Sequence, residues 1–465
     1  MGNHQRLQRA FARNGIALSY RAGIYHVHNE AAQATILLPA SLPLEEKAVR
    51  QLLAFASVHA PNGDSGACKA CATPDFHPGA VAPVGTIVAT SADFVIPSSV
   101  GTDINCGMRL LTTGLNLGQL APRKEALVQR LTRSLLDNGR DVPVSTRAFT
   151  ALFDDGPDAF LDRIDPLGIW AQCDRERLRD EVRRCVGLAS FGGHSRHVPQ
   201  AYRSDAHAVF RDPSLGTPGA GNHFVELQVV DAVLDRYVAY EAGVKAGDVV
   251  VMIHSGSRDL GFYVGQAWMD RAKQAWPAGL KHPTSGLYGL QGALAEEYLQ
   301  AMGAAARYAW ANRVVLAELV RKDLEAVAGA GSSRLIVDVP HNVVLREQGL
   351  NIHRKGATPA HAGDLALIPG SMGDASYLAT GLGNADWLWS CSHGAGRSMR
   401  RQQMRALKTL DEGQQAWQCV TRREERRVEE APHAYKPIGP VIEAQEQAGL
   451  IKAAVRLRPW VTFKA

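Results

Sequence analysis

The chain has 465 residues, 46% of them hydrophobic, which is enough to bury one large domain or two or three smaller ones. Its 51 Lys and Arg residues exceed its 46 Asp and Glu residues, and the formal net charge of +5 permits a polyanionic partner without requiring one. No run of about 18 apolar residues occurs, and the basic N-terminal segment lacks the apolar core of a secretory signal, so we expect a cytoplasmic protein without membrane spans.

The predicted elements of the first third of the chain are one helix and several short strands. Residues 1–40 carry no pattern that can be assigned. Residues 43–60 place apolar side chains at helical spacing behind an acidic first turn, which predicts a surface helix. Residues 84–113 are short apolar runs separated by Gly, Pro and Ser, which is typical of strands and tight turns.

The rest of the chain mixes helices with strands of the buried type. Helical spacing predicts helices over 123–136 and 293–327. The apolar runs in D-V-V-V-M-I-H-S, R-L-I-V-D-V-P-H-N and L-A-L-I-P-G are typical of buried strands that end in a histidine or a Gly-rich turn. No internal repeat or long linker is found, so the sequence predicts an α+β fold in one large domain over 1–465, with 1–40 as an unassigned N-terminal segment.

Two polar features each have two interpretations. Arg179, Arg183 and Arg184 could belong to a nucleic-acid track or to a solvated surface, and we favour the solvated surface. Cys68 and Cys71 form a C-x-x-C pair of the kind found in zinc and redox sites, but no second pair accompanies it. We therefore expect these two cysteines to be structural.

Five short segments combine His or Cys with small residues that let the backbone approach a ligand: D-I-N-C-G-M, G-A-G-N-H-F, I-H-S-G-S-R, P-H-N-V and S-H-G-A-G-R. A single histidine of this kind is more often a hydrogen-bonded core residue, but five similar segments together favour a functional site. The segments supply Asp103, Cys106, His223, His254, His341 and His393.

These residues provide ligands for two metal ions. Asp103 and Cys106 lie three apart on a Gly-flanked turn, so a carboxylate and a thiolate can face one point beside the imidazoles. Two divalent cations stabilise the attacking and leaving oxygens in phosphoryl transfer. Ligand softness by itself favours zinc or cobalt over manganese and leaves the metal open.

Two Gly-rich loops are candidate phosphate sites. The loop over 368–381 offers backbone N–H groups and the hydroxyls of Ser371 and Ser376. The segment H-G-A-G-R, over 393–397, offers a second set of backbone N–H groups followed by the cationic side chain of Arg397. Neither matches the P-loop or the dinucleotide-binding fingerprint, so each taken alone could equally be a structural turn.

Nine motifs in order resemble the RtcB-type RNA-splicing ligases, from about residue 45 to the end: T-P-D-F-H-P-G, V-G-T-D-I-N-C-G-M, G-N-H-F-V-E, I-H-S-G-S-R, P-H-N, R-K-G-A-T, I-P-G-S-M-G, S-Y-L-A-T-G and H-G-A-G-R. The resemblance implies an RNA ligase that uses GTP and two Mn²⁺ ions. In that family a histidine is guanylylated, and GMP passes to an RNA 3′-phosphate before a 5′-hydroxyl attacks. A 2′,3′-cyclic phosphate is first opened.

The resemblance also assigns roles to residues. His393 would be the guanylylated nucleophile, and Asp75, the acid of the P-D-F-H motif, would help with the RNA ends or be structural. The implied metal ligands are Asp103, Cys106, His223, His254 and His341. The implied nucleotide-binding residues are Asn222, His223, Phe224, Val225, Glu226, His341, Asn342, Pro369, Gly370, Ser371, Met372, Ser376, His393, Gly394, Ala395, Gly396, Tyr435 and Lys464.

Within that set, Tyr435 is expected to stack on guanine, Lys464 to contact the O6 and N7 acceptors, and Glu226 to accept from the donor edge of the base. The chain departs from the family pattern at Val81 and Asn105, where glycine is common, and at Arg400, where serine is usual. We expect these departures to alter which RNA ends are accepted or to mark a divergent subgroup.

Two other functions remain open at this point. A dinuclear phosphoesterase acting on RNA ends without nucleotide would need only the metal ligands. A catalytically silent RNA-binding homologue is also compatible with the composition, although every implied chemical residue is present. The RNA target, tolerance of DNA ends, oligomeric state and any accessory activator protein are left open.

Overall fold

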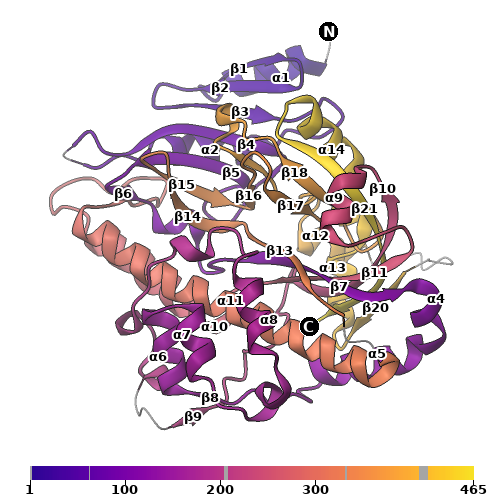
Figure 1. Cartoon of the computed structure of the whole chain (residues 1–465). Coiled ribbons are helices and arrows are strands. Elements are labelled where there is room, and N and C mark those ends of the chain that lie inside the picture. Colours follow the sequence, from indigo (N-terminus) through magenta and orange to yellow (C-terminus); the bar gives the residue numbers. More distant parts are fainter. Residues whose placement is uncertain (1–2, 62, 204–207, 330–331, 408–416) are drawn as a thin grey trace.

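Short apolar segments pair into two mostly antiparallel sheets in the computed structural model, which describes residues 3–61, 63–203, 208–329, 332–407 and 417–465 (Figure 1). The seven-stranded sheet has the order β1 (Ala17–Arg21), β2 (Ile24–His28), β3 (Gln33–Leu37), β4 (Ala67–His77), β5 (Val84–Ser91), β15 (Leu350–Lys355) and β14 (Asn342–Glu347). The eight-stranded sheet has the order β13 (Leu335–Pro340), β7 (Gly107–Asn116), β11 (Asp248–Ser255), β10 (Phe224–Val233), β21 (Ile451–Lys464), β18 (Ser376–Gly381) and β17 (Leu365–Ile368), with β20 (Gln418–Thr421) on β21.

Three small ribbons and the helices complete the described part of the chain. The ribbons pair β6 (Phe94–Val95) with β12 (Leu290–Gln291), β16 (Ala357–Pro359) with β19 (Ser390–Ser392), and β8 (Val144–Ser145) with β9 (Val209–Phe210). The α-helices are α1 (Asn3–Ala12), α2 (Glu46–Ala56), α3 (Pro97–Val100), α4 (Leu117–Leu120), α5 (Lys124–Leu135), α6 (Thr146–Asp154), α7 (Pro157–Arg163), α8 (Arg175–Val182), α9 (Arg236–Ala242), α10 (Arg258–Gln274), α11 (Ala293–Ala328), α12 (Arg401–Ala406), α13 (Glu424–Glu429) and α14 (Ile438–Gln447). Short 3₁₀ turns are η1 (Ala121–Arg123), η2 (Gly168–Gln172), η3 (Leu188–Ser190), η4 (Ser195–His197), η5 (Gln200–Tyr202), η6 (Ala385–Trp387) and η7 (Pro432–Ala434).

The predicted α+β architecture is confirmed, because sheets and helices occur in irregular order around shared cores. The helices expected over 43–60, 123–136 and 293–327 are α2, α5 and α11. The unassigned first forty residues form α1 and β1–β3, which extend the seven-stranded sheet. No helix within the described ranges is long and apolar enough to cross a membrane.

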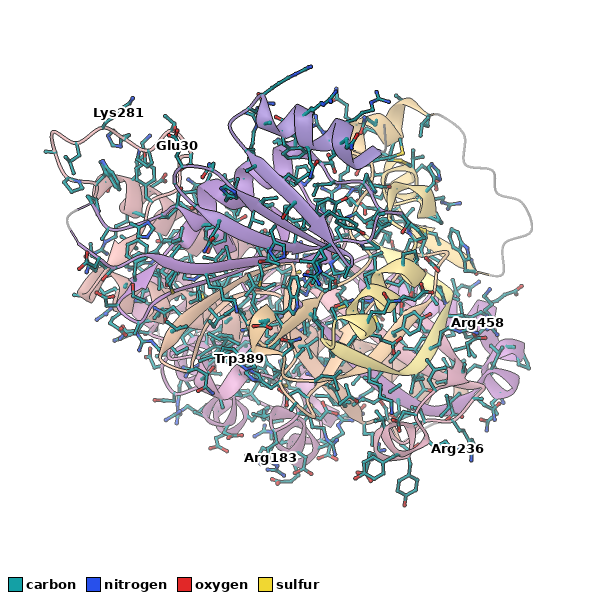
Figure 2. The ribbon with its side chains drawn as sticks, turned by 90° about the horizontal axis from the view of Figure 1, so that it is seen from above. Glu30, Arg183, Arg236, Lys281, Trp389 and Arg458 are labelled. Carbon is teal, nitrogen blue, oxygen red and sulfur yellow. The ribbon has the colours of Figure 1, made fainter. Side chains whose placement is uncertain are left out.

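Two arginines of the polar stretch, Arg179 and Arg183, form ion pairs at the surface. Arg183 pairs with Asp180 and projects from the outside of the molecule (Figure 2). Arg179 lies 2.5 Å from Asp162 and also pairs with Glu176. These contacts support the solvated-surface interpretation, because acidic neighbours offset the charge that would attract a phosphate backbone.

Helix α11 carries a buried arginine that ties the strand ends together. This 36-residue helix runs beneath the sheets (Figure 1) and buries Arg313 at 2% exposure. The Arg313 guanidinium donates to the Asp338 carboxylate at 2.8 Å and to the backbone oxygens of Asn105 and Ser255 at 2.8 and 3.0 Å. A buried cation must be paired to offset its desolvation, so this contact set holds the loops on either side of it in place.

Replacing Arg313 with Met should destabilise the protein by about 3–5 kcal/mol, because Asp338 loses a partner and the backbone oxygens of Asn105 and Ser255 lose their donor. The urea unfolding transition measures the loss. The control Arg183→Met removes an exposed ion pair and should cost less than about 1 kcal/mol. Equal effects of the two substitutions would contradict the structural role given to Arg313.

Candidate metal and nucleotide site

The register of the eight-stranded sheet gathers the predicted metal ligands at one end. His254, near the end of β11, lies opposite the starts of β10 and β7 in the ladder. Cys106 and His223 directly precede those two strands, and His341 directly follows β13, whose last residue pairs with the first residue of β7. Because neighbouring strands are antiparallel, ligands before one strand and after the next meet at the same edge.

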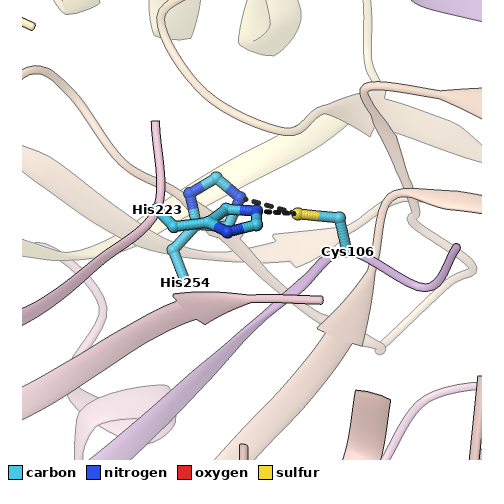
Figure 3. A group of neighbouring side chains, drawn as sticks. All are labelled: Cys106, His223 and His254. Atoms are coloured by element: carbon cyan, nitrogen blue, oxygen red, sulfur yellow. Dashed lines mark hydrogen bonds between the residues drawn. The ribbon is translucent and has the colours of Figure 1, made fainter. Parts of the chain in front are cut away.

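All five predicted ligands lie in this cluster. Figure 3 shows Cys106 facing two imidazoles, with its Sγ 3.1 Å from Nε2 of His223 and 3.2 Å from Nε2 of His254. Nε2 of His223 is also 3.0 Å from Oδ2 of Asp103, and Nε2 of His254 is 3.1 Å from Nε2 of His341. Side chains from four separate segments thus direct nitrogen, sulfur and oxygen atoms at one place.

The chemistry of this donor set fits a metal site. Burial lowers the pKa of His254 and of His341 well below the ordinary value, so both imidazoles are neutral and have a lone pair to share. Burial, together with Asp103, raises the pKa of the Cys106 thiol well above its ordinary value. A cation would stabilise the thiolate and the facing imidazoles. Within the described ranges, Cys106, His223 and His254 are the one group of three such residues with ligand atoms this close together.

The C-x-x-C pair lies outside this cluster. Cys68 and Cys71 are both on β4, the first exposed and the second buried. The Cys68 thiol donates to the backbone oxygen of Ala89 at 3.2 Å. Their position supports the structural interpretation given to them from the sequence.

His393 stands beside the metal cluster and is held by a carboxylate from the other sheet. Its ring centroid is 4.7 Å from that of His341, and its Nδ1 is 2.6 Å from Oδ2 of Asp75 on β4. Burial opposes ionisation of Asp75, but hydrogen bonds from His393 and Thr73 outweigh it and lower the pKa of this carboxyl. An ionised Asp75 accepts the Nδ1–H of His393, which leaves Nε2 with the lone pair.

The loop that carries His393 packs directly against β4. Gly396 has a φ of +76°, and a Cβ on it would lie 2.2 Å from the backbone oxygen of Asp75, so this position requires glycine. The buried Lys436 donates to the backbone oxygens of Pro74 and Phe76, at 3.0 and 2.5 Å, on either side of Asp75. These contacts hold the carboxylate and the histidine together.

A cavity of about 880 Å³ extends from His393 to the end of β21. Of the predicted nucleotide-binding residues it is lined by Asn222, Phe224, Glu226, Pro369, Gly370, Ser371, Met372, His393, Gly394, Ala395, Gly396, Tyr435 and Lys464. The two Gly-rich loops therefore form one wall, as a phosphate site would require.

Five predicted nucleotide-binding residues do not line this cavity. His223 and His341 are in the metal cluster. Val225 points into the hydrophobic core, because side chains alternate along β10 and those of its neighbours face the cavity. Asn342 donates to the backbone oxygen of Asp103 at 3.2 Å, and the hydroxyl of Ser376 accepts from Gln228 behind the cavity wall at 2.9 Å.

The far end of the cavity carries polar groups that sequence reasoning missed. The Glu226 carboxylate accepts from Gln228 at 2.6 Å and from Thr462. Glu430 accepts from the Tyr435 hydroxyl, and no motif marked Glu430, Thr462 or Gln228 in the sequence. Gln228 lies two residues after Glu226 on the same face of β10, so strand alternation carried a signal for it. Thr462 lies on β21 and Glu430 follows α13, and spacing could not bring either one to the cavity.

The three departures from the family pattern occupy different environments. Asn105 has a φ of +50°, a left-handed conformation that Asn and Gly both tolerate, and its side chain donates to Ala306 in α11 at 2.7 Å rather than facing the cavity. Val81 is 41% exposed in the loop between β4 and β5. Arg400 lines the cavity mouth at the start of α12.

Comparison with known proteins assigns the family. The family model described as tRNA-splicing ligase RtcB matches residues 59–465. The chain belongs to the RtcB family of RNA ligases. It is 33% identical over 428 residues to the tRNA-splicing ligase RtcB of Pyrobaculum aerophilum, which covers 83% of this chain and 85% of the relative.

Two further members of the RtcB family are similar to the chain over most of its length. The RNA-splicing ligase RtcB of Mycobacterium tuberculosis is 33% identical over 436 residues, covering 83% of this chain and 95% of the relative. The tRNA-splicing ligase RtcB of Archaeoglobus fulgidus is 32% identical over 432 residues, covering 83% and 85%. The resemblance found in the sequence motifs is therefore confirmed.

Substitution of Cys106 tests the metal site of this RtcB-family chain. Titration with Co²⁺ should give near-ultraviolet thiolate-to-cobalt absorption in the native protein. Cys106→Ser should lose that absorption and bind Co²⁺ about tenfold or more weakly, because the sulfur ligand is gone. Cys68→Ser, a control at an exposed cysteine, should keep both. Absorption that depended on Cys68 and survived in Cys106→Ser would place the metal elsewhere.

Proposed function

We propose that this chain is a GTP- and Mn²⁺-dependent ligase that joins RNA 3′-phosphate or 2′,3′-cyclic phosphate ends to 5′-hydroxyl ends through GMP carried on His393. The observation that carries the proposal is the 2.6 Å contact between Nδ1 of His393 and Asp75, beside the metal cluster and inside a cavity of about 880 Å³. A histidine held in this way is a nucleophile with a fixed tautomer.

The proposed first step uses the free nitrogen of His393. Its lone pair on Nε2 attacks the α-phosphorus of GTP, a P–N bond forms, and the bond from that phosphorus to the pyrophosphate oxygen breaks. The Asp75 carboxylate stabilises the positive charge that develops on the ring. Backbone N–H groups of the Gly-rich loops that begin at Pro369 and Gly394 and line the cavity would hold phosphate oxygens.

The later steps transfer and then release GMP. An oxygen of the RNA 3′-phosphate attacks the phosphorus on His393, so a P–O bond forms and the P–N bond breaks. The RNA 5′-hydroxyl then attacks the activated 3′-phosphate and loses its proton, and GMP leaves. Asp103, Cys106, His223, His254 and His341 would hold the two metal ions. When bound, these ions would offset phosphate charge. A 2′,3′-cyclic phosphate would first be hydrolysed, with water adding to phosphorus and the P–O2′ bond breaking to leave a 3′-phosphate.

The end of the cavity lined by Lys464, Glu226 and Tyr435 supports the proposal that the nucleotide is a guanine nucleotide. Lys464, whose Nζ is 3.3 Å from the backbone oxygen of His223, would donate to the O6 and N7 acceptors of the base. Glu226 would accept from the N1 and N2 donors. Tyr435 lines the same end, with the Arg397 guanidinium 5.0 Å from its ring centroid, and would stack on the base.

Incubation with α-labelled GTP and Mn²⁺ should leave acid-labile GMP on the native protein and none on His393→Ala. Asp75→Asn should slow labelling by about a hundredfold or more, because an amide N–H facing Nδ1 leaves the proton on Nε2. Gel radiography of the protein measures both effects. The matched control His361→Ala removes a partly exposed histidine and should label normally.

Label on His393→Ala would contradict the assignment of the nucleophile. Incubation with RNA that carries a defined 3′ end then distinguishes the ligase from the two other candidate functions. Opening of a cyclic phosphate without GTP, and no joining with it, would instead support a phosphoesterase. Unchanged RNA ends in the presence of metal and GTP would support a silent RNA-binding homologue.

Guanosine should bind more tightly as the pH rises from 6 to 8. Burial raises the pKa of Glu226 to about 7. Below that value the protonated carboxyl cannot accept from both base donors, and above it the carboxylate can, so affinity should increase about tenfold across this interval. Calorimetry with the nucleoside avoids titration of a phosphate. Glu226→Gln should flatten the profile, and an unchanged slope in that variant would exclude Glu226 as the titrating group.

A further inference from the structure

A second cavity of about 470 Å³ adjoins the metal cluster from another side. It shares Asn222 and Arg401 with the larger cavity and is bordered by Asp103 and His223 of the cluster. No other residue that the structure describes lines both cavities, so this second cavity is separate from the proposed guanine site. Its opening beside two proposed metal ligands places any occupant next to the reacting groups.

Arg258 is the cation of this cavity that suits a phosphate-bearing ligand, beside the carboxylates of Asp103 and Asp259, which also line the cavity. Arg401 and Arg426 line it and are paired with glutamates of the C-terminal region, at 2.8 and 2.9 Å. Arg258 also lines it, and its guanidinium makes no ion pair with any residue in the described ranges. The Arg258 Nε donates to the Thr217 hydroxyl at 3.1 Å, and its backbone has a left-handed φ of +52° at the start of α10.

Close packing fixes the position of the Arg258 side chain. A Cβ on Gly219, which has a φ of +95°, would lie 2.1 Å from Nη1 of Arg258 and 2.8 Å from Nδ1 of His223. Because Gly219 has no side chain, the Arg258 guanidinium and the His223 imidazole can both pack against its backbone. A strained backbone and a required glycine together place an unpaired cation beside the cluster.

An exposed aromatic ring stands beside this cation. Phe262 is four residues after Arg258 in α10, so the two side chains lie on the same face of the helix. Phe262 lines the cavity with 61% of its surface exposed, and its ring stacks on no other ring in the described ranges. An exposed aromatic next to cations is the combination with which proteins hold unpaired nucleobases.

We propose that this second cavity binds the phosphate-bearing terminal nucleotide of the RNA strand, with the phosphate toward Arg258 and the terminal base stacked on Phe262. The inference rests on the proposed function, since it assigns one RNA end to a subsite of that reaction. Phe262 is then a substrate-binding residue that favours unpaired ends, because a base within a duplex cannot stack on it.

Binding of a short 5′-fluorescein RNA with a 3′-phosphate tests this subsite by fluorescence anisotropy, without GTP. Phe262→Ala should weaken binding about tenfold, within the range found when a stacking aromatic is removed. Phe262→Tyr should retain the native affinity. Tyr240→Ala, a control at a 79% exposed ring on α9, should also bind normally. Thermal melting confirms that each variant is folded.

A second RNA of the same sequence, whose 3′-terminal nucleotide lacks its base, combines with the Phe262 variant in a double-mutant cycle. The native protein should bind this abasic RNA about tenfold more weakly, and Phe262→Ala should bind it equally weakly, because the two changes remove one interaction. Full affinity of Phe262→Ala for the base-bearing RNA would overturn the proposal, and so would a tenfold loss on both RNAs. Guanylylation of the native protein without RNA tests the proposed function separately.

Discussion

The hydrogen bond between His393 and Asp75 is the constraint on which the site depends. It joins a loop after the small β16–β19 ribbon to β4 of the seven-stranded sheet, across 318 residues of sequence. A buried carboxylate is costly unless it is paired, so Asp75 is stable only where donors surround it. Thr73 and His393 itself donate to the carboxylate, and this pairing fixes the tautomer of the histidine. Lys436 holds the backbone on either side of Asp75, and Gly396 lets the histidine loop pack against β4.

The cluster of candidate metal ligands follows from a different constraint, the antiparallel register of the larger sheet. Four adjacent strands present their ligands at one edge, and a shift by one residue would turn each ligand to the other face. Arg313 reinforces this arrangement from α11, since it donates to the backbone oxygens of Asn105 and Ser255, next to Cys106 and His254, and to the carboxylate of Asp338. The buried charges of the core and the geometry of the cluster are therefore coupled.

The two cavities meet at the cluster and divide the surrounding space between them. Gly-rich loops and a polar base end surround one, while Arg258 and Phe262 surround the other. The chain belongs to the RtcB family, so both cavities are cavities of an RNA ligase. A nucleotide on one side and an RNA end on the other would each reach His393 or the cluster without displacing the other, as a transfer between the two requires.

The sequence by itself determined the elements and the chemistry of the site. Spacing predicted α2, α5 and α11, and the short motifs identified the family and the residues that cluster in the structure, because backbone preference and side-chain chemistry are local properties. The loop expected over 368–381 is shorter, because 376–381 form β18. Only the tertiary structure decided which groups face one another. In the structure Val225 packs in the core and Phe262 is exposed. Glu430 accepts from Tyr435, and Asp75 accepts from His393. Sequence spacing does not predict these environments, because they depend on packing between segments far apart in the chain.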